Sequence, residues 1–77
     1  MAGEEADRLA QQLRELLVKT RKAKGLTQVQ LGKALGRTQT FVSNYERGER
    51  RVGVVDFVLI ARVLGEDAPE LLSALGR

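Results

Sequence analysis

Apolar residues recur along the chain at the spacing of α-helices. In the first segment, Leu13 follows Leu9 by four positions, and Leu16 and Leu17 follow Leu13 by three and four, so that these leucines share one helical face. No stretch alternates apolar and polar residues as a half-buried strand would. The pattern predicts an all-α fold with five helices, at residues 4–24, 28–35, 39–47, 54–64 and 69–75.

Capping residues and glycines mark the ends of these segments. Thr27 and Gln30 fit a capping box at the start of the second helix, and Thr38 is placed to cap the third. Pro69 suits the first turn of the last helix. A glycine follows each of the first four helices, at Gly25, Gly36, Gly48 and Gly65.

Residues 28–47 have the organisation of a helix-turn-helix. Two short helices are joined by the tight turn Gly36-Arg37-Thr38. Gly32 lies inside the second helix, where it costs about 1 kcal/mol relative to alanine. We therefore expect another helix to approach closely at Gly32.

The third helix has an unusual polar face. At about 100° per residue its hydrogen-bonding side chains fall within a sector of about 140° that contains no carboxylate. They are Gln39, Thr40, Ser43, Asn44 and Arg47, opposite a buried sector of Phe41, Val42 and Tyr45. Such amides and hydroxyls can bond the edges of bases in a major groove. The alternative is a solvated face, but that would more often carry Glu, Lys or Ala.

Composition and charge narrow the function. The 77 residues are expected to form one domain, 1–77, without a membrane span, and the acidic N-terminus argues against a secretory signal. Cys and His are absent, so we expect no enzyme activity, no metal site and no cofactor. Residues 14–51 hold ten basic and three acidic residues, which predicts a polyanionic partner, with a merely solvated basic surface as the alternative.

Residues 13–64 resemble the Xre-type, lambda-repressor-like (Cro-like) helix-turn-helix family. The matching pieces are LRELLVKTRKAKGLTQ, QLGKALGRTQTFVSNYERG and the later IARVLG. The resemblance implies a compact five-helix transcriptional regulator, usually a dimeric repressor that reads an inverted-repeat operator in double-stranded DNA. We also expect a cytoplasmic, nucleoid-associated protein of a bacterium or phage, and no small-molecule ligand, since no added ligand-binding domain is present. Residues 1–12 would extend the first helix, and residues 69–75 would form a C-terminal helix.

Residue roles follow from the motif positions of that family. The resemblance implies base contacts by Gln39, Thr40, Ser43 and Asn44. It implies phosphate contacts by Gln28, at an uncapped helix N-terminus, and by Thr38, Arg37, Arg47, Arg50 and Arg51. Many relatives have a proline where this chain has Val52-Gly53, so the path of the loop after the third helix stays open. Arg21 and Glu46 match positions of a structural ion pair.

The fourth helix carries more apolar residues than one buried face requires. Its core stripe is Phe57, Ile60, Ala61 and Leu64. A second stripe could pack within the chain or against another subunit, and we favour a two-fold homodimer because two half-sites usually need two modules. The expected interface comprises Val55, Leu59, Val63, Leu71, Leu72 and Leu75.

Sequence-specific DNA binding is therefore the leading hypothesis. A second is an antitoxin-like module whose main target is a toxin protein and whose DNA binding is secondary. A third is an architectural protein that binds nucleic acid through charge alone.

Overall fold

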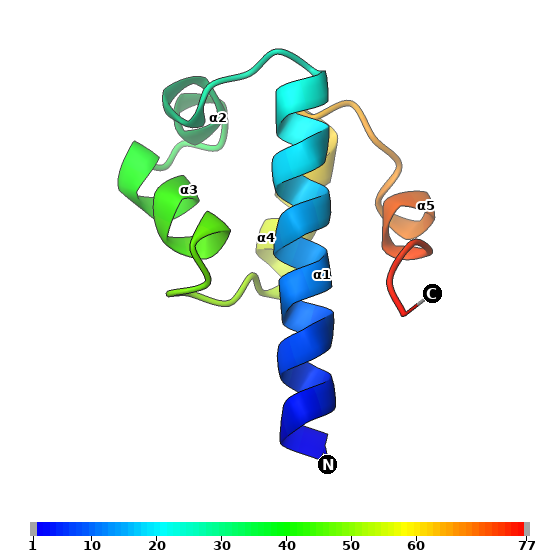
Figure 1. Cartoon of the computed structure of the whole chain (residues 1–77). Coiled ribbons are helices and arrows are strands. Elements are labelled where there is room, and N and C mark those ends of the chain that lie inside the picture. The colour runs from blue at the N-terminus through cyan, green and yellow to red at the C-terminus, as the bar shows by residue number, and fades with distance from the viewer. Residues whose placement is uncertain (1, 77) are drawn as a thin grey trace.

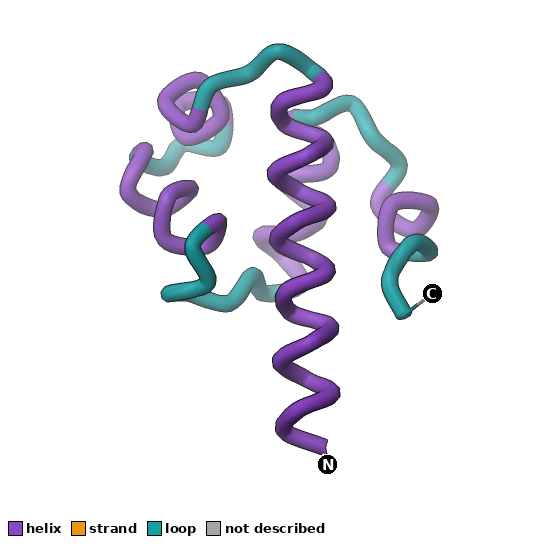
Figure 2. The backbone as a smooth tube through the Cα atoms, in the orientation of Figure 1, coloured by secondary structure: helices purple, strands orange, loops and turns teal. Residues whose placement is uncertain are grey.

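The computed structural model describes residues 2–76, and within them all regular structure is helical, as the sequence predicts. The helices are α1 (Ala2–Ala23), α2 (Gln28–Ala34), α3 (Gln39–Glu46), α4 (Val54–Val63) and α5 (Ala68–Leu72). Figure 1 shows α1 as the long central element, with α2 and α3 on one side and α5 on the other. The N-terminal turns of α1 extend beyond the other helices, and short loops join all five elements (Figure 2).

The predicted helix caps are present. Thr27 Oγ1 accepts a hydrogen bond from the Gln30 amide at 3.1 Å, and Gln30 Oε1 accepts one from the Thr27 amide at 2.8 Å. Thr38 Oγ1 accepts a bond from the amide of Phe41 at 3.3 Å. The four glycines predicted to stop helices have positive φ angles, which residues with a Cβ rarely adopt.

The observed helix bounds differ slightly from the expected ones. The first four helices end one residue earlier than predicted, since the residue before each glycine belongs to the turn. α1 starts at Ala2 rather than near residue 4. α5 starts at Ala68, after the cap Asp67, and ends at Leu72 instead of Leu75 because the backbone turns at residues 73–76.

The hydrophobic core lies where the first four helices meet. Each of them contributes at least one fully buried aliphatic side chain, and the largest of these are Leu17, Leu31, Val42 and Ile60. Burial of each such side chain contributes about 1.5–3 kcal/mol. α5 contributes none that is fully buried, and it packs mainly along α4. The core therefore fixes α3 against three helices and leaves α5 at the edge.

The turn of the helix-turn-helix is tight at Gly32. A Cβ placed there would lie 2.8 Å from both the carbonyl carbon and the carbonyl oxygen of Thr38. The close approach expected from the sequence is thus confirmed, although the neighbour is the residue that caps α3 rather than the helix itself. This contact sets the position of α3 relative to α2.

The residues expected at the interface come from the second stripe of α4 (Val55, Leu59 and Val63) and from residues 71–75, and they are divided between two environments. Val63 and Leu71 are partly buried and pack on the core. Packing within the chain, the alternative considered above, accounts for these two residues. Val55, Leu59 and Leu72 are 73%, 41% and 49% exposed, and Leu75 is half-buried. None of the helices in residues 2–76 is long and apolar enough to cross a membrane.

Candidate nucleic-acid interface

The polar residues of α3 lie on one side of the helix. Gln39 and Thr40 are exposed, and Ser43 and Asn44 are half-buried. Arg47 caps the C-terminal end of the helix and is exposed. We call these five residues the polar face of α3. Phe41, Val42 and Tyr45, on the opposite side, are buried, so the core holds the helix with its polar face outward.

A buried ion pair joins the end of α3 to α1. Arg21 Nε lies 2.7 Å from Glu46 Oε2, and Arg21 Nη2 lies 3.1 Å from Glu46 Oε1. The two side chains are only 9% and 7% exposed. Arg21 Nη1 also donates to the carbonyl of Leu26 at 2.7 Å, so one guanidinium joins α1, the following loop and α3. The hydrogen bond to Glu46 raises the pKa of Arg21, against the opposing effect of burial.

The ion pair continues to the polar face through Gln28. The Nε2 atom of Gln28 donates to Glu46 Oε1 at 2.8 Å, and its Oε1 atom accepts from Gln39 Nε2 at 3.3 Å. A carboxylate can only accept hydrogen bonds, so it fixes which end of the Gln28 amide points at Glu46. With its Nε2 atom toward Glu46, Gln28 presents its Oε1 atom to Gln39, so Gln39 must be the donor in the bond between them. Gln39 keeps its Oε1 acceptor and one N–H for another partner.

The expectation that Gln28 lies at an uncapped helix N-terminus is wrong. Thr27 caps α2 with a complete capping box, and the amide of Gln30 is already bonded to it. The Gln28 side chain lies instead between Glu46 and Gln39. Its place beside the polar face comes from side-chain hydrogen bonds rather than from free backbone amides.

Arg47 makes three bonds at the other end of the polar face. Its Nη1 donates to Ser43 Oγ at 2.7 Å and its Nη2 to Asn44 Oδ1 at 2.9 Å. Its Nε donates to Glu49 Oε2 at 2.6 Å. All three guanidinium nitrogens are engaged, and two of them hold side chains of the polar face. The sequence indicated Arg47 as a cation near DNA but not as a partner of its neighbours.

Two further arginines that were expected to contact phosphate, Arg37 and Arg50, lie beside Asp56. Arg37 lies 2.9 Å from Asp56 and its guanidinium carbon 4.3 Å from the centre of the Phe41 ring. The guanidinium carbon of Arg50 lies 5.0 Å from the centre of the same ring, and its Nη2 atom lies 3.9 Å from Asp56 Oδ2. Nothing in the local sequence pattern marks Asp56 as their partner, because 19 positions separate it from Arg37.

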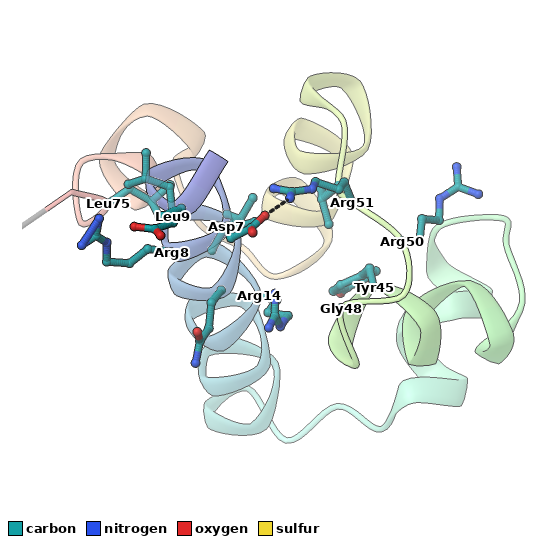
Figure 3. Close-up of a pocket in the computed structure, with 14 residues that line it drawn as sticks. Asp7, Arg8, Leu9, Arg14, Tyr45, Gly48, Arg50, Arg51 and Leu75 are labelled. Atoms are coloured by element: carbon teal, nitrogen blue, oxygen red, sulfur yellow. Dashed lines mark hydrogen bonds and ion pairs between the residues drawn. The ribbon is translucent and has the colours of Figure 1, made fainter. Parts of the chain in front are cut away.

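Arg51 follows a different direction from Arg50. Its Nη2 bonds Asp7 at 2.6 Å and its Nη1 bonds the Ala6 carbonyl at 3.2 Å. This bridge crosses a groove of about 720 Å³ between the first half of α1 and residues 48–52. In Figure 3, Arg51 points across the groove to Asp7, whereas Arg50 points away from it. The loop path that the sequence left open thus separates the two arginines, and only Arg50 lies beside α3.

The chemistry of the site is that of recognition. Within residues 2–76, no group of three or more His, Cys, Asp or Glu side chains is arranged to hold a metal ion. The polar face offers amides, hydroxyls and one guanidinium at the surface of a rigid helix, with further guanidinium groups beside it. These groups suit hydrogen bonding to base edges and pairing with phosphates.

Comparison with known proteins places this geometry in a family. The family model described as "Helix-turn-helix" matches residues 17–71. The match reaches into α5, further than the 13–64 core expected from the motifs. A solved structure described as an XRE-family like protein from Pseudomonas syringae pv. tomato is 40% identical, with a TM-score of 0.91. The alignment covers 95% of this chain and 89% of that chain. None of the curated proteins that were compared matches the chain.

Proposed function

Because the chain belongs to the Xre-like helix-turn-helix family of DNA-binding transcription regulators, we propose that it is a dimeric repressor with a specific operator. The operator is an inverted repeat, and each protomer places α3 in the major groove of one half-site. The family and the fold are regulatory rather than enzymatic. The protein acts in the cytoplasm, on the DNA of a bacterium or phage.

The polar face of α3 is the observation that carries this proposal. A major groove admits an α-helix, and the first residues of a recognition helix reach the bases. Gln39 and Thr40 are at that end and are exposed. The bond from Gln39 to Gln28 leaves one acceptor and one donor on the Gln39 amide, which is the pair of groups that adenine requires. Ser43 and Asn44 read the next bases along the groove.

The arginines supply the affinity for phosphate. Arg37, Arg47 and Arg50 flank α3, while Arg51 takes part through the end of the loop. Each is now paired with an exposed or partly exposed carboxylate of the same chain. The pairs of Arg47 with Glu49 and of Arg51 with Asp7 are exposed, and such pairs contribute only about 0–1 kcal/mol, so phosphates can replace these two carboxylates at little cost. Gln28 and Thr38 add contacts at the start of the two helices.

The dimer uses the exposed part of the α4–α5 surface. Val55, Leu59 and Leu72 supply apolar area that the protomer leaves in water, and Leu75 lies nearby in sequence. Two protomers double the base contacts, which a single short helix needs in order to discriminate an operator from other DNA. The same apolar surface would suit a toxin protein, so an antitoxin role is the second candidate. A stoichiometric heterologous complex that excludes homodimers would favour it.

Selection from random duplex DNA tests the function. We expect one preferred inverted repeat, from which excess nonspecific DNA fails to displace the protein. Gln39→Ala should lower the affinity for that site by about 1–3 kcal/mol and relax one base position in each half-site. Arg50→Ala, the control, should weaken binding to all sequences alike. Binding without any selected motif would instead support the architectural alternative.

A further inference from the structure

The three bonds of Arg47 determine which hydrogen-bonding groups remain on the second half of the polar face. A guanidinium has only donors, so Ser43 Oγ and Asn44 Oδ1 act as acceptors toward it, at 2.7 and 2.9 Å. This fixes the Asn44 amide with its oxygen toward Arg47 and its NH₂ group away from it. The Ser43 hydroxyl likewise keeps its hydrogen for another partner.

The groups left over on Ser43 and Asn44 are therefore mainly donors. Each oxygen has a second lone pair, but that lone pair lies beside a cation, which disfavours the approach of another donor. Glu49 holds the third nitrogen of Arg47 at 2.6 Å and so keeps the guanidinium in this orientation. The first half of the polar face differs, because Gln39 retains an acceptor as well as a donor.

We propose that Arg47 is a positioning residue that sets the base preference of Ser43 and Asn44. With Arg47 in place, these two side chains select a base edge that presents acceptors in the major groove. Guanine presents two, O6 and N7, whereas adenine presents one acceptor and one donor. The inference rests on the proposed function, and it assigns to Arg47 a role in specificity beyond contact with phosphate.

A freely rotating asparagine would behave differently. Without Arg47 its amide can turn to offer one donor and one acceptor, the arrangement that binds adenine in a bidentate manner. Removal of Arg47 should then change which base is preferred, and not merely how tightly the DNA is bound. A residue that only neutralises phosphate has no such effect.

The test is selection from random duplex DNA with Arg47→Met, which keeps an unbranched apolar stem but removes every donor. The wild type should prefer guanine at the position that Asn44→Ala relaxes. Arg47→Met should shift that preference toward adenine by about tenfold in relative affinity.

Arg51→Met is the matched control, because Arg51 bonds Asp7 and Ala6 instead of the polar face. It should lower affinity without a change in the selected base. Circular dichroism verifies that both variants are folded.

The outcomes separate this inference from the proposed function. An unchanged base preference in Arg47→Met, with Asn44→Ala still relaxing one position, would overturn the role of Arg47 alone. A preference for adenine in the wild type at that position would also overturn it. If the wild type selected no motif, or if Asn44→Ala changed none of its positions, the proposed base readout itself would fail. Replacement of the selected guanine by 7-deazaguanine should weaken the wild type more than Arg47→Met.

Discussion

The two sides of this molecule are stabilised in different ways. On one side, α1, α2 and α3 are joined by the buried Arg21–Glu46 ion pair and by the hydrogen bond from the Gln28 side-chain amide to Glu46. The turn between α2 and α3 also has no space for a side chain at Gly32. On the other, α4 and α5 meet through apolar contacts and leave Val55 mostly, and Leu59 and Leu72 partly, in water. The first side is complete within one protomer. The second side has apolar area that nothing in residues 3–76 covers.

The difference separates two requirements of DNA recognition. The proposed base readout needs side chains held within a narrow range of positions, and the hydrogen bonds that run from Arg21 through Glu46 and Gln28 hold Gln39 in this way. The proposed dimer needs a surface that leaves the free protomer folded and whose burial against a second copy lowers the free energy. In the proposed function, polar bonds with fixed geometry serve the first requirement and exposed aliphatic residues serve the second. We therefore call the first side the readout side and the second the assembly side.

The largest expected effect is loss of the ion pair on the readout side. Glu46→Ala leaves the Arg21 guanidinium buried without its carboxylate and removes the acceptor of Gln28. We expect the free energy of unfolding to fall by about 3–5 kcal/mol, as measured by urea denaturation. Glu49→Ala is the control, because its pair with Arg47 is exposed and contributes about 0–1 kcal/mol. Equal stability of Glu46→Ala and the wild type would show that the readout side does not depend on this pair.

A smaller effect is expected at the turn. In Gly32→Ala the new methyl group would lie 2.8 Å from the Thr38 carbonyl, so the backbone before α3 has to move. Overpacking of this kind costs about 1–3 kcal/mol, against a gain of about 1 kcal/mol in helix propensity. Thermal denaturation should therefore detect a net loss of stability. Gly3→Ala, in α1, meets no atom within 4 Å and should be neutral or slightly stabilising. A Gly32→Ala variant as stable as the wild type would mean that the turn has room to adjust.

Local features were predictable from the sequence because their causes are local. The cap at Thr27 depends on Gln30, three residues away, and the burial of Phe41 and Val42 follows from helical spacing. Gly32 also identified the close contact at the turn, since a glycine inside a helix needs a compensating reason.

Apart from the Arg21–Glu46 ion pair, which the family resemblance implied and the structure contains, pairings between distant residues were not predictable from the sequence. Arg51 bonds Asp7, 44 positions away, and Gln28 bonds Glu46, 18 positions away. Such contacts depend on how the helices cross, which the periodicity of a single helix does not determine. The division of the α4 stripe has the same origin, because Val63 is covered by the fold while Leu59, four residues earlier, is not.

The smallest effect on protomer stability is expected on the assembly side, where the consequence for function is large. Leu59 is 41% exposed and only partly covered, so Leu59→Glu should change the free energy of unfolding of the protomer by about 1 kcal/mol or less. A charge at this position nevertheless opposes burial against a second copy. Sedimentation should find a folded monomer with weak, salt-sensitive DNA binding and little preference for the operator.

Leu9→Glu makes the same exchange at a similarly exposed site on α1 and should remain dimeric. If Leu9→Glu dissociated and Leu59→Glu did not, the interface would lie on α1. Unfolding of Leu59→Glu would instead assign Leu59 to the core of the protomer, and the contrast between the two sides would then be lost.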